Sequence, residues 1–222
     1  MTKQDLIIIG SSGHAKVVID VIEKEGRYNI IGLLDPVRPI GEKTLGYEVI
    51  GTIDMIPSLI KNKSDCSFFI AIGDNWNRHK EMKHILDVHP EAIFASTIHP
   101  SAQIGRDVTI GMGVVIMAGA IVNSSTKIGD FTILYTKSSV DHDCTVEPFV
   151  SLAPNATTGG TVIIGAYSAI GISASIKHGV KIGEHCVIGG GSMVLKNTES
   201  YTINYGVPSK KVGIRIEGDK YL

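Results

Sequence analysis

An aliphatic side chain recurs at every sixth position between residues 98 and 194, with no insertion, and Thr158 is the one exception. The aliphatic positions are Ile98, Ile104, Ile110, Ile116, Val122, Ile128, Leu134, Val140, Val146, Leu152, Ile164, Ile170, Ile176, Ile182, Ile188 and Val194. Four residues after each position except the last lies a small or β-branched residue. This second series is Ala102, Val108, Val114, Ala120, Thr126, Thr132, Ser138, Cys144, Val150, Ala156, Val162, Ser168, Ala174, Val180, Cys186 and Ser192. A member of the second series and the next aliphatic residue are two positions apart, so on a strand both face the same interior.

A fixed short period of this kind is typical of a β-solenoid. Three six-residue sides would close a triangular coil of eighteen residues, and the repeats make about five coils, or a prism of roughly 25 Å. A helix is excluded because six is not a multiple of 3.6. Glycine is frequent one position after the aliphatic residue, and we expect a corner of positive φ there. These glycines are Gly105, Gly111, Gly129, Gly159, Gly165, Gly171, Gly183 and Gly189.

The first third of the chain alternates short apolar runs with segments of helical spacing. This order predicts a small parallel, Rossmann-like α/β sheet. The expected strands are residues 6–9, 30–34, 47–52, 67–72 and 92–94, and the expected helices are residues 15–25, 53–61 and 76–88. The repeats begin near Ser96 without a flexible linker. We therefore expect two domains, 1–96 and 97–222, packed against each other.

Ligands of parallel α/β sheets bind at the carboxyl ends of the strands. The turn at residues 10–14 could bring backbone N–H groups and a helix N-terminus to a phosphate. Asp35 at the next strand end could accept a hydrogen bond from a ribose hydroxyl, and residues 73–75 line the third strand end. Ordinary strand–helix turns remain an alternative, because the full G-x-G-x-x-G pattern is absent.

One corner of the predicted solenoid is strongly charged: Asp141, His142 and Asp143 follow Val140. His142 would project outward, and a neighbouring carboxylate fixes the tautomer of a histidine and raises its basicity, as a general base requires. A solvated turn is the alternative. Cys144 falls in the small inward series, so we interpret it as part of the core rather than as a nucleophile.

A metal site is a further alternative at the same edge. His142 and His178 are thirty-six residues apart, which is two coils, and His185 is the candidate third ligand. The γ-class carbonic anhydrases are solenoids with three such histidines.

Composition limits the function classes. The chain has 222 residues, 43% hydrophobic and 19% charged, and a net charge of −1, so no basic surplus points to nucleic acid or an anionic membrane. No apolar run reaches the length of a membrane span, and the first residues resemble a strand rather than a signal peptide. Three cysteines form no even disulfide framework, which favours the cytoplasm.

Several motifs fall in order along the whole chain. They are Gly10-x-x-Gly13-His14, Leu34-Asp35, residues 71–75, residues 138–144, residues 171–173, residues 189–192 and residues 206–210. On these motifs the chain resembles the bacterial sugar acyltransferases of the PglD and NeuD type, with the perosamine enzymes as relatives. The resemblance implies a left-handed parallel β-helix after the α/β domain. It also implies a homotrimer.

The resemblance further implies N-acetylation, from acetyl-CoA, of a nucleotide-linked amino sugar such as a UDP-4-amino-4,6-dideoxy sugar, in surface glycan biosynthesis. His142 would be the general base and Asp143 its carboxylate, with direct transfer and no covalent enzyme intermediate. Gly160, one coil along the edge, is our hypothesis for the N–H donor to the oxyanion. The nucleotide sugar would be held by Ser12, Gly13, His14, Asp35 and Gly73. The acetyl-CoA groove would be lined by Ser151, Ile172 and Gly190, with Pro208 in the C-terminal tail nearby.

Three departures from the family pattern bear on this assignment. Ser151 stands where close relatives have a second histidine, Pro36 follows Asp35, and Asp143 replaces a glutamate. Other functions stay open on the sequence. They are O-acetylation of a sugar of the sialic-acid type, a γ-carbonic-anhydrase-like metal enzyme, and a non-catalytic scaffold or nucleotide sensor.

Overall fold

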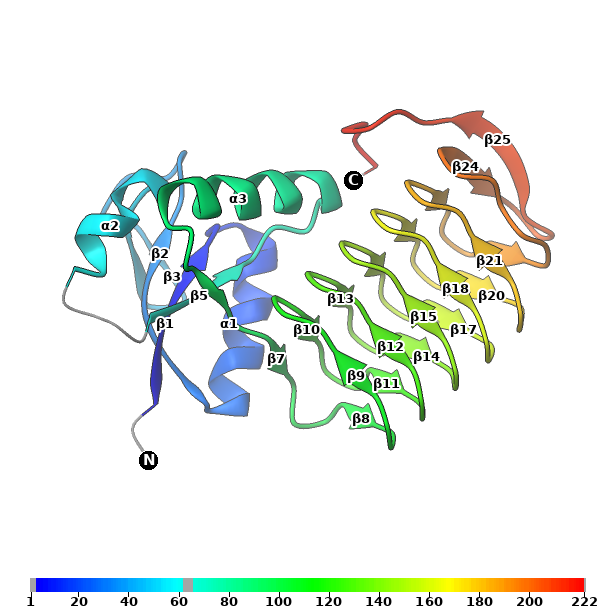
Figure 1. The fold of residues 1–222 in the computed structure, drawn as a ribbon, viewed down its shortest axis with the longest axis horizontal. Helices are drawn as coiled ribbons and strands as arrows, with labels where there is room; N and C mark the ends of the chain where they lie inside the picture. The colour runs from blue at the N-terminus through cyan, green and yellow to red at the C-terminus, as the bar shows by residue number, and fades with distance from the viewer. Residues whose placement is uncertain (1–2, 62–65, 222) are drawn as a thin grey trace.

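The computed structural model describes residues 3–61 and 66–221, and it places an α/β domain at the start of a β-solenoid (Figure 1). The α/β sheet has the strand order β3-β4-β2-β1-β5-β6, with β3 antiparallel and the other strands parallel. Its strands are β1 (Gln4–Ile9), β2 (Tyr28–Leu34), β3 (Lys43–Thr44), β4 (Tyr47–Gly51), β5 (Cys66–Ile70) and β6 (Ile93–Phe94). The predicted parallel sheet is confirmed, and the short strand β3 was not predicted.

Three helices pack on this sheet: α1 (Gly13–Glu25), α2 (Ile56–Leu59) and α3 (Asn75–Val88). The apolar face of α1 is fully buried at Val18, Ile19 and Ile22, as its helical spacing requires. The predicted helix 53–61 is shorter than expected. It opens as a 3₁₀ turn, Ile53–Met55, and continues as the single turn of α2.

The repeat region forms a triangular prism of two-residue strands. Each strand pairs in parallel with the strand eighteen residues further on, as Val115 pairs with Ile133. The first solenoid strands are β7 (Thr97–Ile98), β8 (Gln103–Ile104), β9 (Thr109–Ile110), β10 (Val115–Ile116), β11 (Ile121–Val122), β12 (Lys127–Ile128), β13 (Ile133–Leu134), β14 (Ser139–Val140) and β15 (Thr145–Val146). The later ones are β16 (Ser151–Leu152), β17 (Thr157–Thr158), β18 (Ile163–Ile164), β19 (Ala169–Ile170), β20 (Ser175–Ile176), β21 (Lys181–Ile182), β22 (Val187–Ile188) and β23 (Met193–Val194).

Both repeating series face the interior of the prism, as predicted. From Val114 to Val194 they form one apolar core, with small polar members such as Thr126 and Ser168 also buried. The aliphatic side chains of the first coil are less covered, and Ile104 is 39% exposed. The sequence period therefore fixes the direction of these side chains, while their depth also depends on the coils above and below.

The prediction of positive φ at the corner glycines was wrong. Positive φ occurs two positions later, for example at Asp143 (56°) and Phe149 (58°). The glycines instead allow the next coil to approach. A Cβ on Gly165 would lie 2.5 Å from Glu184 N, and one on Gly105 would lie 2.6 Å from Ser124 N.

A ladder of stacked rings runs along one edge of the solenoid and joins the two domains. Its members are Phe131, Phe149, Tyr167, His185 and Tyr201, with successive ring centroids 4.6–5.2 Å apart. Trp76 and His79 of α3 pack on this ladder, and the Tyr167 hydroxyl lies 2.9 Å from His79 Nδ1. Buried Arg78 donates from Nε to the Phe131 carbonyl oxygen at 2.8 Å. The domains are therefore in close contact, as expected from the missing linker.

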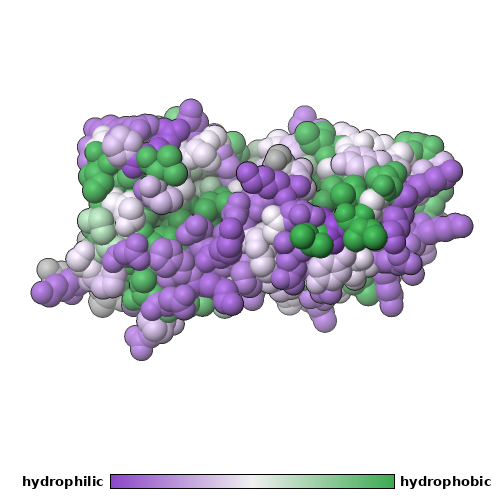
Figure 2. Space-filling model, turned by 90° about the horizontal axis from the view of Figure 1, so that it is seen from above, coloured by the Kyte–Doolittle hydropathy of each residue, from purple (hydrophilic) through white to green (hydrophobic). Residues whose placement is uncertain are grey.

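The chain ends in a hairpin and a returning tail. Strand β24 (Thr202–Tyr205) extends one solenoid sheet, and β25 (Lys210–Ile214) pairs with it antiparallel. The tail then runs back toward α3 (Figure 1), and Tyr221 reaches Asn75 at the start of that helix. Apolar side chains are exposed on the hairpin and just beyond it, including Val207, Val212, Ile214 and Ile216. Figure 2 shows apolar patches among hydrophilic side chains on both halves of the molecule, including the solenoid half.

Candidate active site

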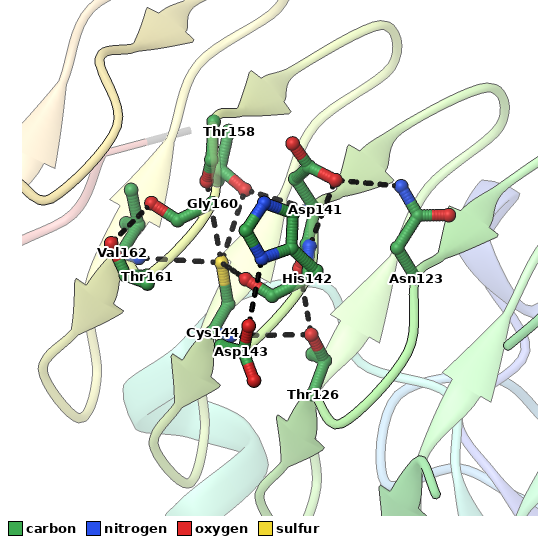
Figure 3. Close-up of polar contacts among 11 residues, drawn as sticks. Asn123, Thr126, Asp141, His142, Asp143, Cys144, Thr158, Gly160, Thr161 and Val162 are labelled. Atoms are coloured by element: carbon green, nitrogen blue, oxygen red, sulfur yellow. Dashed lines mark hydrogen bonds and ion pairs between the residues drawn. The ribbon is translucent and has the colours of Figure 1, made fainter. Parts of the chain in front are cut away.

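His142 lies at an outward corner between β14 and β15, with its side chain 54% exposed. Its Nδ1 is 2.8 Å from Asp143 Oδ2 (Figure 3). This hydrogen bond, followed by the negative charge of Asp141, raises the pKa of His142 above its usual value. With Nδ1–H donated to Asp143, Nε2 carries the free lone pair, which is the arrangement that a general base needs.

The corner is held by several hydrogen bonds from both neighbouring coils. Asp141 Oδ1 accepts from His142 N at 2.8 Å and from Asn123 Nδ2 at 2.7 Å. These bonds, with the Asn123 amide as the largest cause, lower the pKa of Asp141. The Asp141 carbonyl accepts from Thr126 Oγ1 at 2.7 Å, and its N–H donates to Thr158 Oγ1 at 3.1 Å. The backbone beside His142 is therefore held by hydrogen bonds from both neighbouring coils.

Gly160 lies directly beneath the His142 ring. A Cβ at Gly160 would come within 2.5 Å of Nε2 and Cε1 of the imidazole. The Gly160 carbonyl accepts from Gly179 N at 3.0 Å. The Gly160 N–H makes no hydrogen bond to any described residue. The glycine thus gives the ring its space and leaves a backbone N–H without a hydrogen bond to a described residue beside the imidazole.

Neither a cysteine nucleophile nor a three-histidine metal site is supported at the corner that carries His142. Cys144 is 1% exposed, and burial raises the pKa of its thiol, so its predicted place in the core is confirmed. His178 shares the edge of His142, whereas His185 is stacked in the aromatic ladder at another edge. Within residues 3–61 and 66–221 no three His, Cys, Asp or Glu side chains are placed to hold a metal ion.

An apolar pocket of about 350 Å³ lies on the solenoid sheet that contains β13, β16, β19, β22 and β24. Ser151, Ile172 and Gly190 all line it. Pro208 does not line it and lies in the turn between β24 and β25. Tyr221 from the returning tail forms one wall. Its hydroxyl accepts from Asn75 N at 3.0 Å and lies 3.3 Å from the Gly73 carbonyl oxygen and 3.5 Å from Ser151 Oγ.

The carboxyl ends of β1, β2 and β5 meet beside this pocket. Asp35 accepts from Ser11 Oγ at 2.7 Å and from three backbone N–H groups. Burial alone would raise the pKa of Asp35, but these hydrogen bonds outweigh it and hold the pKa below its usual value. The Ser12 hydroxyl makes no capping bond to α1, and a Cβ on Gly13 would meet no atom within 4 Å. The first turn of α1 is therefore open.

His14 turns from α1 toward the solenoid, where its ring centroid is 5.5 Å from that of Tyr135. Burial, together with the charge of Arg78, lowers the pKa of His14 to about 4, and Nε2 is buried with no hydrogen-bond partner among the described residues. Tyr135 also lines the apolar pocket. Tyr135 and Tyr221 thus connect the strand ends of the first domain to the pocket.

The structure brings some predicted residues together and separates others. Ser12, Gly13 and Asp35 share one sheet edge, and Ser151, Ile172 and Gly190 share the pocket. His142 and Gly160 lie at the corner between the other two solenoid sheets, away from the pocket. Within one chain His142 and the pocket are on different parts of the prism.

Comparisons with known proteins match segments in both parts of the chain. Residues 5–85 match the PglD N-terminal domain, residues 161–196 match the bacterial transferase hexapeptide (six repeats), and residues 95–118 match the hexapeptide repeat of succinyl-transferase. A GDP-perosamine N-acetyl transferase from Caulobacter crescentus is 32% identical over 94% of this chain and 97% of that chain, with a TM-score of 0.88. The chain belongs to the PglD/NeuD-type bacterial sugar acyltransferases.

Two further relatives agree with this assignment. The acetyltransferase domain of PglB from Neisseria gonorrhoeae FA1090, solved with acetyl coenzyme A, is 28% identical over 95% of this chain and all of that chain, with a TM-score of 0.86. GDP-perosamine N-acetyltransferase of Escherichia coli O157:H7 is 28% identical over 78% of both chains. The predicted fold class and enzyme class of this sugar acyltransferase are therefore confirmed.

Sequence reasoning missed several residues around the candidate site of the sugar acyltransferase. Tyr221 lies seventy positions from Ser151, and no periodicity points to their contact. The aromatic ladder did leave a signal, because Phe131, Phe149, Tyr167 and His185 are eighteen residues apart. Thr158 is also visible in the sequence, because it interrupts the aliphatic series.

Proposed function

We propose that this acyltransferase moves the acetyl group of acetyl-CoA to the amino group of a nucleotide-linked amino sugar during surface glycan synthesis. The observation that carries the proposal is the exposed His142, paired through Nδ1 with Asp143 and packed on Gly160. The Caulobacter relative, solved in complex with CoA and GDP-perosamine, supports the substrate class. A UDP-linked 4-amino-4,6-dideoxy sugar is the specific acceptor that we propose.

The chemistry needs one base and one oxyanion donor. The sugar nitrogen attacks the thioester carbonyl carbon, a C–N bond forms, and His142 Nε2 takes a proton from the nitrogen. The C–S bond then breaks, and the departing sulfur takes up a proton. Asp143 keeps Nδ1–H oriented and stabilises the imidazolium. The free Gly160 N–H stabilises the oxyanion in our proposal, and positioning of both substrates supplies much of the rate.

We assign the nucleotide sugar to domain 1–96. Ser12 and Gly13 open the first turn of α1, where a helix N-terminus favours a phosphate. Asp35, already bonded to the Ser11 loop, shapes the same edge, and Gly73 lies at the neighbouring strand end. His14 stays neutral at pH 7, because its pKa is lowered to about 4. It is therefore a hydrogen-bonding rather than a charged contact.

We assign the acetyl-CoA to domain 97–222. The apolar pocket lined by Ser151, Ile172 and Gly190 suits a pantetheine arm, and Pro208 lies on the hairpin beside it. Ser151, in place of the histidine of close relatives, provides a hydroxyl contact.

Separation of His142 from the pocket supports a homotrimer in which the edge of one chain completes the pocket of the next. The exposed apolar residues of the C-terminal hairpin, such as Val212 and Ile214, are consistent with such an assembly. Cytoplasmic location is part of the same proposal, and three free, buried cysteines support it. The described residues contain no helix long and apolar enough to cross a membrane.

The experiment is acetyl transfer measured as released CoA thiol, with UDP-, GDP- and CMP-linked amino and hydroxy sugars. Wild type, His142→Ala and the matched control His178→Ala are compared, since His178 lies two coils further along the same edge. We expect turnover of one amino-sugar nucleotide, lost in His142→Ala and kept in His178→Ala, with oligomer size unchanged. Turnover of hydroxyl acceptors alone, or no thiol release with any acceptor, would contradict the proposal.

A further inference from the structure

Thr158 is the one polar residue in the aliphatic series that fills the solenoid, and its side chain is 8% exposed. It lies between Val140 and Ile176 in the same interior stack. Burying a hydroxyl in an apolar core is unfavourable unless the hydroxyl is hydrogen-bonded. Thr158 Oγ1 accepts from Asp141 N at 3.1 Å and lies 3.7 Å from Cys144 Sγ (Figure 3). Both partners belong to the segment that carries His142.

The hydroxyl replaces a backbone acceptor at this point. In the coil before, Asn123 N donates to the Val140 carbonyl, and in the coil after, Gly159 N donates to the Ile176 carbonyl, both at 2.9 Å. The Asp141 N–H occupies the equivalent place but donates to the Thr158 side chain. The backbone pairing between β14 and β17 is therefore shorter than elsewhere in the sheet. Among the described solenoid strands, the β14–β17 step alone keeps one residue pair, Ser139 with Thr157, where the others keep two.

Asp141 links the Thr158 hydroxyl to His142, the proposed base. Its N–H is held by Thr158, its carbonyl by Thr126, and its carboxylate accepts from Asn123 and from His142 N. The Thr126 bond is a general device of the prism, because Thr132 and Ser168 bond in the same way to carbonyls fifteen residues ahead. The Thr158 bond is not repeated along the described edge and occurs at the corner of His142.

We propose that Thr158 is a positioning residue for His142. Its hydroxyl shifts the Asp141 backbone away from the regular ladder and so sets the corner at which His142 pairs with Asp143 and lies over Gly160. The inference rests on the proposed function, because it treats His142 as the base. Thr158 itself does not contact the substrates.

The test compares Thr158→Val, Thr158→Ser and the control Thr132→Val, a buried threonine whose hydroxyl bonds to Glu147 O at another corner. Valine restores the aliphatic series, so the regular ladder re-forms and the melting temperature is kept or raised. We expect kcat of Thr158→Val to fall roughly ten- to a hundred-fold, because small displacements of a reacting group are costly. The KM for acetyl-CoA stays within about twofold. Thr158→Ser restores kcat, and Thr132→Val leaves it unchanged.

A second readout does not depend on turnover. The His142 imidazole is titrated by NMR in the full-length wild type and variants. We expect Thr158→Val to move the His142 titration and Thr158→Ser to leave it in place. An unmoved titration with unchanged kcat, or a loss of stability without either effect, would overturn the inference. Absence of acetyl transfer in the wild type, with the titration still moved, would instead count against the proposed function and leave the positioning role supported.

Discussion

The imidazole of His142 rests on Gly160, a residue eighteen positions further along the chain and one coil further along the same edge. Its Nε2 and Cε1 atoms occupy the space that a Cβ at Gly160 would need, at a separation of 2.5 Å. A methyl group at this position must push the ring away, since an approach below 3.0 Å does not occur between real atoms of this kind. Glycine at position 160 therefore lets the imidazole of the neighbouring coil lie in its present place.

Gly160→Ala is expected to lower kcat roughly ten- to a hundred-fold while KM for acetyl-CoA changes little, because His142, the proposed base, is displaced and the pocket is not touched. Steady-state kinetics measure both constants. Gly213→Ala is the matched control, because a Cβ at Gly213 would meet its nearest atom at an ordinary 3.5 Å. Full activity in Gly160→Ala would show that the His142 ring does not need its present place.

Asp143→Asn is expected to shift the acid limb of the kcat/KM profile to lower pH. The hydrogen bond to Asp143 is the largest cause of the raised pKa of His142, and the base is active when neutral. In the wild type, activity therefore appears as pH rises through a value above 6.5, and in the variant it appears at a lower pH. The maximal kcat also falls, by roughly ten- to a thousand-fold, because the tautomer is no longer fixed.

Asparagine suits this position, since Asp143 has a φ of 56° and asparagine tolerates that conformation. Asp107→Asn is the control: Asp107 has a φ of 58° and lies two coils earlier on the same edge. The measurement is the pH dependence of acetyl transfer by the wild type, Asp143→Asn and Asp107→Asn under the same conditions. An acid limb that stays in place in Asp143→Asn would mean that Asp143 does not set the basicity of His142.

Tyr221→Phe is expected to reduce the free energy of unfolding by about 1–3 kcal/mol, because the change leaves the Asn75 N–H without its acceptor. Asn75 is 1% exposed, so water does not readily replace the hydroxyl. Chemical denaturation measures the difference. Tyr205→Phe is the control, because Tyr205 lines the same pocket and its hydroxyl bonds to no described residue. Equal stability of the two variants would show that the tail is not anchored through this hydroxyl.

The period of six was sufficient to predict the prism, its core and the corner position of His142, because side-chain direction on a strand follows from residue number alone. It also predicted that Cys144 faces inward. The corner glycines were assigned the wrong backbone conformation, since their role depends on the distance to the next coil and not on the local turn. That distance is set by packing, which one strand's sequence does not contain.

The α/β elements were predicted from apolar runs, with small errors at their ends. The contacts between domains were not. Arg78 donates to Phe131, fifty-three residues away, and Tyr221 reaches Gly73 from the far end of the chain. Such pairs follow from the docking of α3 and the tail on the solenoid. Residues held together by docking carry no shared spacing, so the candidate site could be predicted only in separate pieces.

His14 is expected to make the protein sensitive to mild acid. Its pKa is lowered from 6.5 to about 4 in the folded chain, so between these values the unfolded chain binds a proton that the folded chain does not. The contribution of His14 to stability therefore falls as pH drops from 6.5 toward 4 and levels off below. The full shift corresponds to about 3 kcal/mol.

The variant His14→Gln loses this pH-dependent part of the stability. The control His99→Gln, on the surface beside Ser101, keeps it. Part of the slope persists in His14→Gln, because burial also lowers the pKa of His79 and His185. Urea unfolding at a series of pH values measures the slopes, and identical slopes for wild type and His14→Gln would contradict the prediction.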